Sequence, residues 1–264
     1  MDNQLNLIEP PKQAKPQSEF VHVDRLVSKP EPEITLLHGD CLKLMFDLPD
    51  NSVDMVCCDM PYGTTACKWD TVLPLDMLWH HYKRIVKDNG AIVLFSAQPF
   101  TSTLVATEPK LFKYSWFWRK NRATSVLNAK RQPLRDVEEI CVFNAKGYNP
   151  QGLVEVSQPS RNSKKDYDNY GNGTCKSYTQ KYTNYPRQVL EFKSVQRTIH
   201  PTQKPVELIE YLIKTYTNEG DTVLDNCMGS GTTGVACKNL NRNFVGIELD
   251  DKYFDIATKR IEEC

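Results

Sequence analysis

One segment near the end of the chain constrains the fold more than any other. An apolar run at 222–224 leads to Asp225, then to a turn with Gly229 and Gly231, a helix-like stretch and a second apolar run that ends at Glu248. This order is typical of a parallel α/β unit, in which glycines bring the backbone close to a ligand and a helix N-terminus offers free amide donors. The acid after the second run is suited to bind ribose hydroxyls.

Two classes of cofactor compete for this unit. Together with Gly234, the glycines match the spacing of the dinucleotide fingerprint, so a nicotinamide cofactor is one interpretation. In that fingerprint the first glycine follows its strand almost directly, whereas here residues 225–228 intervene. A carboxylate at the strand end also suits an ammonium group better than a pyrophosphate. S-adenosylmethionine, which carries an amino acid and a nucleoside, fits both features. A P-loop is excluded because no Gly-Lys-Ser/Thr follows.

The chain from Ile34 onward alternates short apolar runs with longer helix-like segments, which predicts an α/β fold with a largely parallel sheet. The predicted strands are 34–37, 53–58, 91–95, 114–118, 140–143, 222–224 and 244–247. The predicted helices are 41–46, 75–87, 205–217, 232–240 and 252–261.

Two regions depart from this alternation. Residues 1–32 are rich in Pro, Gln, Lys and Glu and are interpreted as a flexible arm, with the globular domain at 33–264. Residues 146–195 are polar, rich in Asn, Tyr and Ser, and show no clear helix or sheet pattern. A stretch of this length inside a domain is either disordered or a functional insertion. Its interleaved tyrosines favour the hypothesis that it becomes ordered on a partner.

Two further motifs lie in the globular part. Asp59-Met-Pro-Tyr62 follows an apolar strand, and a motif from His200 to Pro205, with Thr202 and Lys204 inside it, precedes an amphipathic helix. Taken singly, each is weak, because a strand-end turn or a helix start explains it. His200 has no partner at i+3 or i+4, so we do not expect it to be a metal ligand.

Taken together and in this order, the three motifs resemble those of the β class of amino-directed DNA methyltransferases. In that class the catalytic motif precedes the cofactor motif and the target-recognition region lies between them. The resemblance covers the chain from Ile34 to its end. It implies a Rossmann-like seven-stranded methyltransferase sheet with 146–195 as an inserted target-recognition segment, S-adenosylmethionine as cofactor, and an exocyclic amine of double-stranded DNA as methyl acceptor.

The resemblance also implies roles for individual residues. Asp225, Gly229 and Gly231 would hold the amino-acid end of the cofactor, and Glu248 its ribose. The full set of expected cofactor-binding residues is Asp40, Cys41, Cys58, Asp59, Thr202, Lys204, Asp225, Cys227, Gly229, Ser230, Gly231, Thr232, Glu248 and Leu249. The expected catalytic residues are Asp59, Met60, Pro61 and Tyr62.

The chemistry of an exocyclic amine explains why such residues are needed. Its lone pair is delocalised into the ring, so two acceptors must hold its N–H groups while the nitrogen rehybridises. The Asp59 carboxylate and the Met60 carbonyl can be those acceptors, and Tyr62 can stack on a base rotated out of the duplex. The family usually has proline where Met60 stands, and a backbone role tolerates that change. No covalent nucleophile is required, so the cysteines need no catalytic role.

The choice of base stays open among related interpretations. Asp at position 59, where some members have Ser, favours the N6 amine of adenine. The alternatives are the N4 amine of cytosine and, because of Met60, an inactive DNA-binding protein of the same fold. A C5-cytosine enzyme is disfavoured because the chain lacks a Pro-Cys dipeptide. A zinc deaminase is disfavoured because H-x-E followed by P-C-x-x-C is absent.

The charge is unevenly distributed although its sum is zero. Residues 110–204 hold 18 Lys and Arg against 7 Asp and Glu, an excess of 11 positive charges that the rest of the chain balances. A positive lobe suits the phosphates of DNA. The expected DNA-binding residues are Lys113, Arg119, Lys120, Arg122, Lys130 and Arg131. The interleaved Trp116 and Trp118 are either core residues or part of that surface.

Composition limits the cellular context. No apolar stretch reaches the 18 residues of a membrane span, so no membrane partner is expected. Nine cysteines without a C-x-x-C pair indicate reduced thiols, a cytoplasmic location and no metal. A homodimer and a cognate restriction endonuclease, as in a restriction–modification system, are the partners considered, and the chain does not decide on either.

Overall fold

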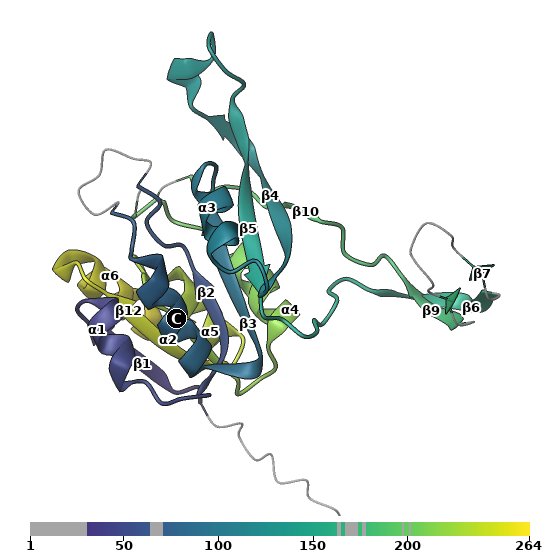
Figure 1. Ribbon diagram of the computed structural model, residues 1–264, viewed down its shortest axis with the longest axis horizontal. Helices are drawn as coiled ribbons and strands as arrows, with labels where there is room; N and C mark the ends of the chain where they lie inside the picture. The colour runs from purple at the N-terminus through teal and green to yellow at the C-terminus, as the bar shows by residue number, and fades with distance from the viewer. Residues whose placement is uncertain are drawn as a thin grey trace, which may run out of the picture. The chain divides into compact units, whose positions relative to one another are not determined.

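A central sheet organises the computed structural model, which describes residues 31–63, 71–162, 165–166, 174–175, 178–196, 198–200 and 202–264 (Figure 1). Within these residues the sheet has eight strands in the order β1-β12-β11-β2-β3-β5-β4-β10. The strands are β1 (Ile34–His38), β2 (Val53–Cys58), β3 (Val86–Ser96), β4 (Phe112–Thr124), β5 (Arg135–Phe143), β10 (Val189–Glu191), β11 (Thr222–Asp225) and β12 (Asn243–Glu248).

Strand direction divides the sheet into two parts. β1, β12, β11, β2 and β3 are parallel neighbours, whereas β5 runs antiparallel to both β3 and β4. β10 pairs with β4 in parallel. Parallel strands are covered on both faces and therefore read as continuous apolar runs, as in β2, where only Asp54 is not fully buried. The predicted α/β fold with a largely parallel sheet is confirmed.

Helices cover both faces of the sheet and form two hydrophobic cores. One face carries α1 (Cys41–Leu44), the 3-10 turn η1 (Met45–Asp47), α2 (Leu75–Ile85) and α3 (Phe100–Thr107). The other carries α4 (Val206–Tyr216), α5 (Thr232–Asn239) and α6 (Asp251–Glu262). In α4 the buried Leu208 and Leu212 lie four residues apart and so share the face that packs on the sheet.

All predicted strands and helices are present, but β3, β4 and β5 extend by up to six residues beyond their predicted ends, and β3 begins at Val86, inside the predicted helix 75–87. α3 was not predicted. Its sequence, with three threonines and a valine, contains β-branched residues that are weak helix formers. Packing of Phe100 and Leu104 against the core stabilises the helix instead.

The segment 146–195 contains strands, although its sequence shows no clear sheet pattern. β6 (Val154–Asn162) pairs with β9 (Tyr178–Thr183), and β7 (Lys165–Asp166) pairs with β8 (Thr174–Cys175). β10 adds the eighth strand to a sheet predicted to have seven. Such strands show no alternation because they bury little; in β10 only Leu190 is buried.

Residues 1–30 of the predicted arm lie outside the described part of the chain. No helix within the described ranges is long and apolar enough to cross a membrane.

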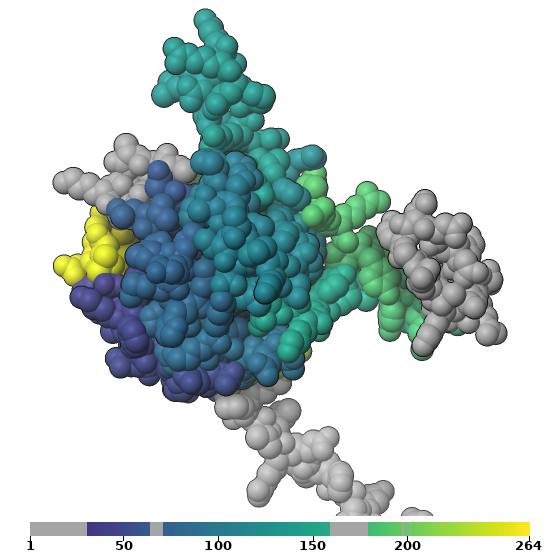
Figure 2. Space-filling view, in the orientation of Figure 1, coloured from purple at the N-terminus to yellow at the C-terminus, as the bar shows by residue number. Residues whose placement is uncertain are grey.

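β4 and β5 form a hairpin that extends beyond the neighbouring strands (Figure 2). Its tip holds the 3-10 turn η2 (Val126–Asn128). Because β5 is reversed, this tip lies on the side of the sheet where the parallel strands end.

Candidate functional site

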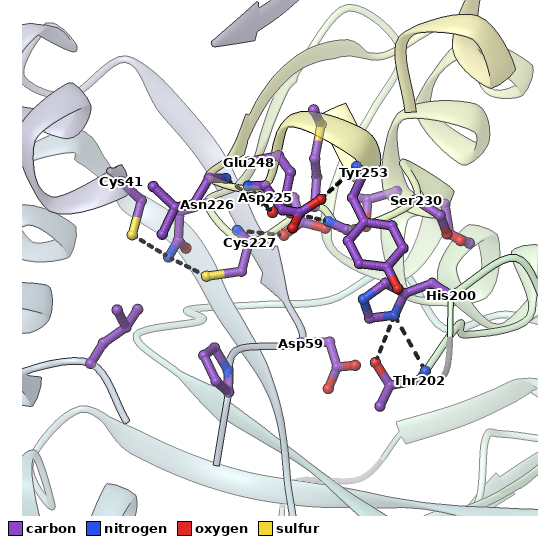
Figure 3. A pocket seen from close by; sticks show the side chains of 18 of the residues that line it. Cys41, Asp59, His200, Thr202, Asp225, Asn226, Cys227, Ser230, Glu248 and Tyr253 are labelled. Atoms are coloured by element: carbon purple, nitrogen blue, oxygen red, sulfur yellow. Dashed lines mark hydrogen bonds between the residues drawn. The ribbon is translucent and has the colours of Figure 1, made fainter. Parts of the chain in front are cut away.

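A cavity of about 700 Å³ opens at the carboxyl ends of the parallel strands. Asp225 ends β11, Glu248 ends β12 and Asp59 follows β2, so neighbouring strands deliver three carboxylates to one edge. Figure 3 shows Asp225 and Glu248 together on one side, with Asp59 across the cavity from them. The sheet topology therefore assembles residues that are far apart in the sequence.

Asp225 is a buried acid held by neutral donors. The hydroxyl of Thr233 donates to Oδ2 at 2.6 Å, and the amide of Cys227 donates to Oδ1 at 3.2 Å. Only 4% of the residue is exposed, and this burial raises its pKa to about 7. A carboxylate in this state gains from a cation placed beside it in the cavity.

The glycine turn after β11 has a backbone that few other residues adopt. Gly229 and Gly231 have φ of 52° and 76°, in the left-handed region. A Cβ at Gly231 would lie 2.9 Å from Cβ of Ala257 in α6, so the turn and this helix pack in direct contact. Thr232 begins α5 and lines the cavity, and its hydroxyl is buried without a hydrogen-bond partner in the described residues.

Glu248 is fixed by backbone amides. Its Oε1 accepts from the amides of Leu249 and Asp250 at 3.0 and 2.9 Å, and its Oε2 accepts from Gly229 at 2.8 Å. A carboxylate oxygen can accept two hydrogen bonds, so Oε2 keeps acceptor capacity toward the cavity. The acid of β12 thereby also ties the glycine turn to the neighbouring strand.

Asp59 lies among charged and aromatic partners. Its Oδ2 is 2.5 Å from Nζ of Lys204, and the hydroxyl of Tyr62 donates to Oδ1. Burial raises the pKa of Asp59, an effect that the Lys204 ammonium opposes. Although burial alone would lower it, the pKa of Lys204 is raised because Asp59 and Glu138 favour its charged form. The ring of Tyr62 stacks on Phe100, with centroids 5.5 Å apart.

The loop before α4 forms another wall of the cavity. The ring of His200 packs edge-on against Tyr253, with centroids 4.3 Å apart (Figure 3). Its Nδ1 lies 3.1 Å from the hydroxyl of Thr202 and accepts weakly from the Thr202 amide at 3.3 Å. Burial, followed by the nearby Lys204, lowers the pKa of His200, which favours the neutral ring that such an acceptor requires.

Most of the expected cofactor-binding residues line this cavity. They are Asp40, Cys41, Asp59, Thr202, Lys204, Asp225, Cys227, Gly229, Ser230, Thr232, Glu248 and Leu249. Of the other expected site residues, Pro61 lines it, whereas Cys58, Met60, Tyr62 and Gly231 are not part of its wall. The side chain of Met60 is buried in the core beneath it.

Several residues that line the cavity were not expected from the sequence. Asn226 receives a hydrogen bond from Tyr82 at 2.6 Å, and Phe95 comes from β3. His200 and Tyr253 are further examples. The motif containing His200 indicated this loop. No sequence pattern marks Phe95 or Tyr253, because their positions at the cavity depend on how β3 and α6 pack in the folded chain.

The expected DNA-binding residues lie on or beside the β4–β5 hairpin. Lys113, Arg119, Arg122, Lys130 and Arg131 are exposed. Lys120 instead pairs with the buried Glu138 at 2.6 Å. Trp116 and Trp118 are core residues, 5% and 3% exposed, with indole N–H groups that donate to Tyr216 and to the carbonyl of Phe192.

A family model described as DNA methylase (N6_N4_Mtase) matches residues 53–259, which include the three motifs. The chain belongs to this family of N6/N4 DNA methylases. The resemblance to amino-directed DNA methyltransferases is therefore confirmed at the level of the N6/N4 family.

Curated relatives of this methylase are named as DNA methyltransferases as well. It is 29% identical over 242 residues to the type II methyltransferase M.HpaI of Haemophilus parainfluenzae, covering 86% of this chain and 74% of the relative. It is also 29% identical over 251 residues to the DNA adenine methyltransferase YhdJ of Escherichia coli K12, with 86% and 82% covered.

Similar solved structures identify the cofactor. The methylase is 30% identical to the M1.HpyAVI–SAM complex, with a TM-score of 0.60 over 86% of this chain and 99% of that one. PvuII DNA methyltransferase (cytosine-N4-specific), at 14% identity and a TM-score of 0.64 over 88% and 89%, shows the shared fold. The cofactor of this methylase is S-adenosylmethionine, and the buried Asp225 and the unpartnered hydroxyl of Thr232 fit its amino-acid end.

Proposed function

We propose that this methylase transfers a methyl group from S-adenosylmethionine to the exocyclic N6 amine of adenine in double-stranded DNA. The observation that carries the proposal is the carboxylate of Asp59, held at the cavity by Lys204 and Tyr62. An aspartate at this position, rather than serine, favours adenine within the family. The similarity to a relative named as a DNA adenine methyltransferase supports the same choice.

The residues of the glycine unit, which comprises β11, the glycine turn after it, α5 and β12, would hold the cofactor. The Asp225 carboxylate would bind its ammonium group, and the Thr232 hydroxyl at the start of α5 would bind its carboxylate. Glu248 Oε2 would accept a ribose hydroxyl. When bound, S-adenosylmethionine supplies an electrophilic methyl group on a positively charged sulfur.

Asp59 and Met60 would activate the amine. Asp59 accepts one N–H of the target amine, and the carbonyl of Met60 accepts the other, so the nitrogen lone pair turns toward the methyl carbon. The side chain of Met60 is buried in the core and carries no amide or carboxylate, so the acceptor proposed for this residue is its backbone carbonyl. As the nitrogen forms its new bond it must lose a proton, and the raised pKa of Asp59 makes this carboxylate a better base than an exposed aspartate.

The aromatic neighbour of Asp59 suits a flipped base. A base inside the duplex cannot reach a cavity at the sheet edge, so the target must rotate out of the stack. Tyr62 is anchored by its hydroxyl to Asp59 and by its ring to Phe100. We infer that this fixed ring stacks on the extruded base beside the carboxylate.

Transfer of a labelled methyl group to duplex DNA, followed by nucleoside analysis, tests the proposal. We expect the label in N6-methyladenine, confined to one short sequence if the enzyme serves a restriction–modification system. Label in 4-methylcytosine would reverse the choice of base. Intact DNA binding without transfer would favour the inactive alternative.

Asp59→Ala should abolish this transfer while cofactor binding is largely kept. The matched control is Asp88→Ala, an exposed aspartate on β3. If Asp59→Ala turns over at nearly the normal rate, Asp59 is not the acceptor.

A further inference from the structure

Glu138 is a buried acid that no sequence motif marks. It lies on β5 opposite Trp118 of β4, and 8% of it is exposed. Strands seldom bury a glutamate unless its charge is compensated, because removing a carboxylate from water is costly. Neighbouring cations are therefore expected around the Glu138 carboxylate.

Two lysines compensate this charge and connect it to the active site. Oε2 of Glu138 lies 2.6 Å from Nζ of Lys120, and Oε1 lies 2.9 Å from Nζ of Lys204. The same Lys204 ammonium lies 2.5 Å from Oδ2 of Asp59. Two carboxylates and two ammonium groups thus alternate in one chain of contacts, and their charges cancel.

The groups of this chain of contacts come from a strand and from a loop. Glu138 lies in a strand with neighbours on both sides, whereas Lys204 lies in the loop before α4. Phe95 of β3 adds a further contact, with the Lys204 ammonium 4.9 Å from its ring centroid. The strand can therefore fix the ammonium of the loop, and the ammonium in turn fixes Asp59.

We propose that Glu138 is a positioning residue for methyl transfer, acting through Lys204 to hold the Asp59 carboxylate where it meets the target amine. This inference rests on the proposed function of Asp59. Removal of Glu138 would leave the buried Lys204 ammonium with one carboxylate partner in place of two and weaken the attachment of its loop to β5. Alignment of the amine would suffer, because a displacement of about 1 Å can lower a rate about 100-fold.

The charge of Glu138 also affects the protonation of Asp59. Burial is the largest influence that raises the pKa of Asp59, and the negative charge of Glu138 adds to it. Within the described residues, the titratable groups that face Asp59 are Lys204, Glu138, Tyr62, Asp225, Cys57 and Cys58. Asp59 must be ionised to accept an N–H, so activity falls as the pH falls through its pKa. Without the charge of Glu138 that pKa is lower, and the acidic limb of the rate profile moves to lower pH.

The test is Glu138→Gln in the full chain, measured as kcat, KM for DNA and the affinity for S-adenosylmethionine across pH. We expect kcat to fall about 10- to 100-fold, cofactor affinity to be unchanged, and the acidic limb to move to lower pH. The matched control is Glu139→Gln, the next residue on the same strand, whose side chain accepts a hydrogen bond from Gln98. The control should retain the wild-type rate and profile.

A wild-type kcat and an unmoved acidic limb in Glu138→Gln would overturn the inference, provided that the wild-type enzyme methylates DNA. Absence of methylation by the wild type would instead refute the proposed function. If Glu138→Gln does not fold, Glu138→Asp is tested in its place. This variant keeps the negative charge, but its shorter side chain holds the carboxylate farther from Lys204. That variant should lose kcat with its acidic limb in place, and a wild-type kcat there would equally refute the positioning role.

Discussion

At the residue scale, Asp59 and Asp225 are both buried acids, but their partners differ. Asp59 has the ammonium of Lys204 beside it, whereas the hydrogen bonds recorded for Asp225 come from a hydroxyl and an amide. The protein thus compensates one charge itself and leaves the other for a cation in the cavity. This difference supports the proposal that Asp225 binds the ammonium group of the cofactor.

Cofactor affinity should therefore depend on the ionisation of Asp225. Its pKa is raised to about 7 by burial, so the neutral acid prevails at lower pH and binds an ammonium poorly. We expect affinity for S-adenosylmethionine to be full above this pKa and to fall by about tenfold per pH unit below it. Titration calorimetry between about pH 5.5 and 8.5 measures the effect, with proton release on binding near neutral pH.

Asp225→Asn removes the titrating group and should flatten this dependence, with affinity about 10-fold lower at high pH. Asp255→Asn, an exposed acid on α6, is the control and should retain the wild-type curve. An unchanged pH dependence in Asp225→Asn would show that another group binds the ammonium.

Sequence patterns could predict the acids that follow strands but not those within them. Asp59, Asp225 and Glu248 each end an apolar run, and in a parallel sheet that position is informative. Glu138 stands beside Glu139 in an ordinary strand, and its importance depends on contact with Lys204, which only the folded chain creates.

At the element scale, the glycine turn joins β11 to α5 and packs against α6. Gly231 is constrained twice, by its positive φ of 76° and by the 2.9 Å that a Cβ would leave to Ala257. The turn therefore determines how closely α6 can approach.

Gly231→Ala should lower the free energy of unfolding by about 2 kcal/mol or more, because the left-handed conformation and the close contact both oppose a Cβ. Urea unfolding followed by circular dichroism measures the loss. Gly147→Ala is the matched control, since no heavy atom lies within 4 Å of its Cβ position and its φ is not positive. Equal midpoints for the two variants would contradict this packing argument.

Elements could be predicted where burial imposes a continuous apolar run or a helical period. The parallel strands show the first pattern and α4 shows the second, and both were found. β6 and β9 pair mainly with each other and bury little, so they have no apolar alternation to read. The sequence of α3 shows neither a strand pattern nor a helix pattern, and the helix forms because Phe100 and Leu104 pack on the core.

At the scale of the whole molecule, the balanced charge separates by region. Residues 110–204, which carry an excess of 11 positive charges, include the hairpin, whereas the glycine unit lies in the rest of the chain, which is acidic. Among the hairpin cations, Arg119 and Lys120 are paired with Glu191 and Glu138. Exposed cations nearer the tip are therefore better placed to neutralise phosphates.

Neutralising Arg122, Lys130 and Arg131 together to Gln should weaken DNA binding and reduce the slope of log K against log salt by about 3. Binding to a labelled duplex at several salt concentrations measures this slope. The control replaces Lys43, Lys252 and Lys259 of α1 and α6, and should leave the slope unchanged. An equal slope in both triple variants would exclude the hairpin from phosphate contact.

The reversed direction of β5 has a consequence for how such an enzyme can change. The β4–β5 tip emerges at the edge where the parallel strands end, yet the hairpin contributes no backbone to the glycine unit. Residues can be inserted or deleted around η2 without altering the connection between β11, α5 and β12. A graft of a longer or shorter tip should thus alter the grip on DNA and leave affinity for S-adenosylmethionine intact. Affinity for DNA and methyl chemistry can then change independently within one domain.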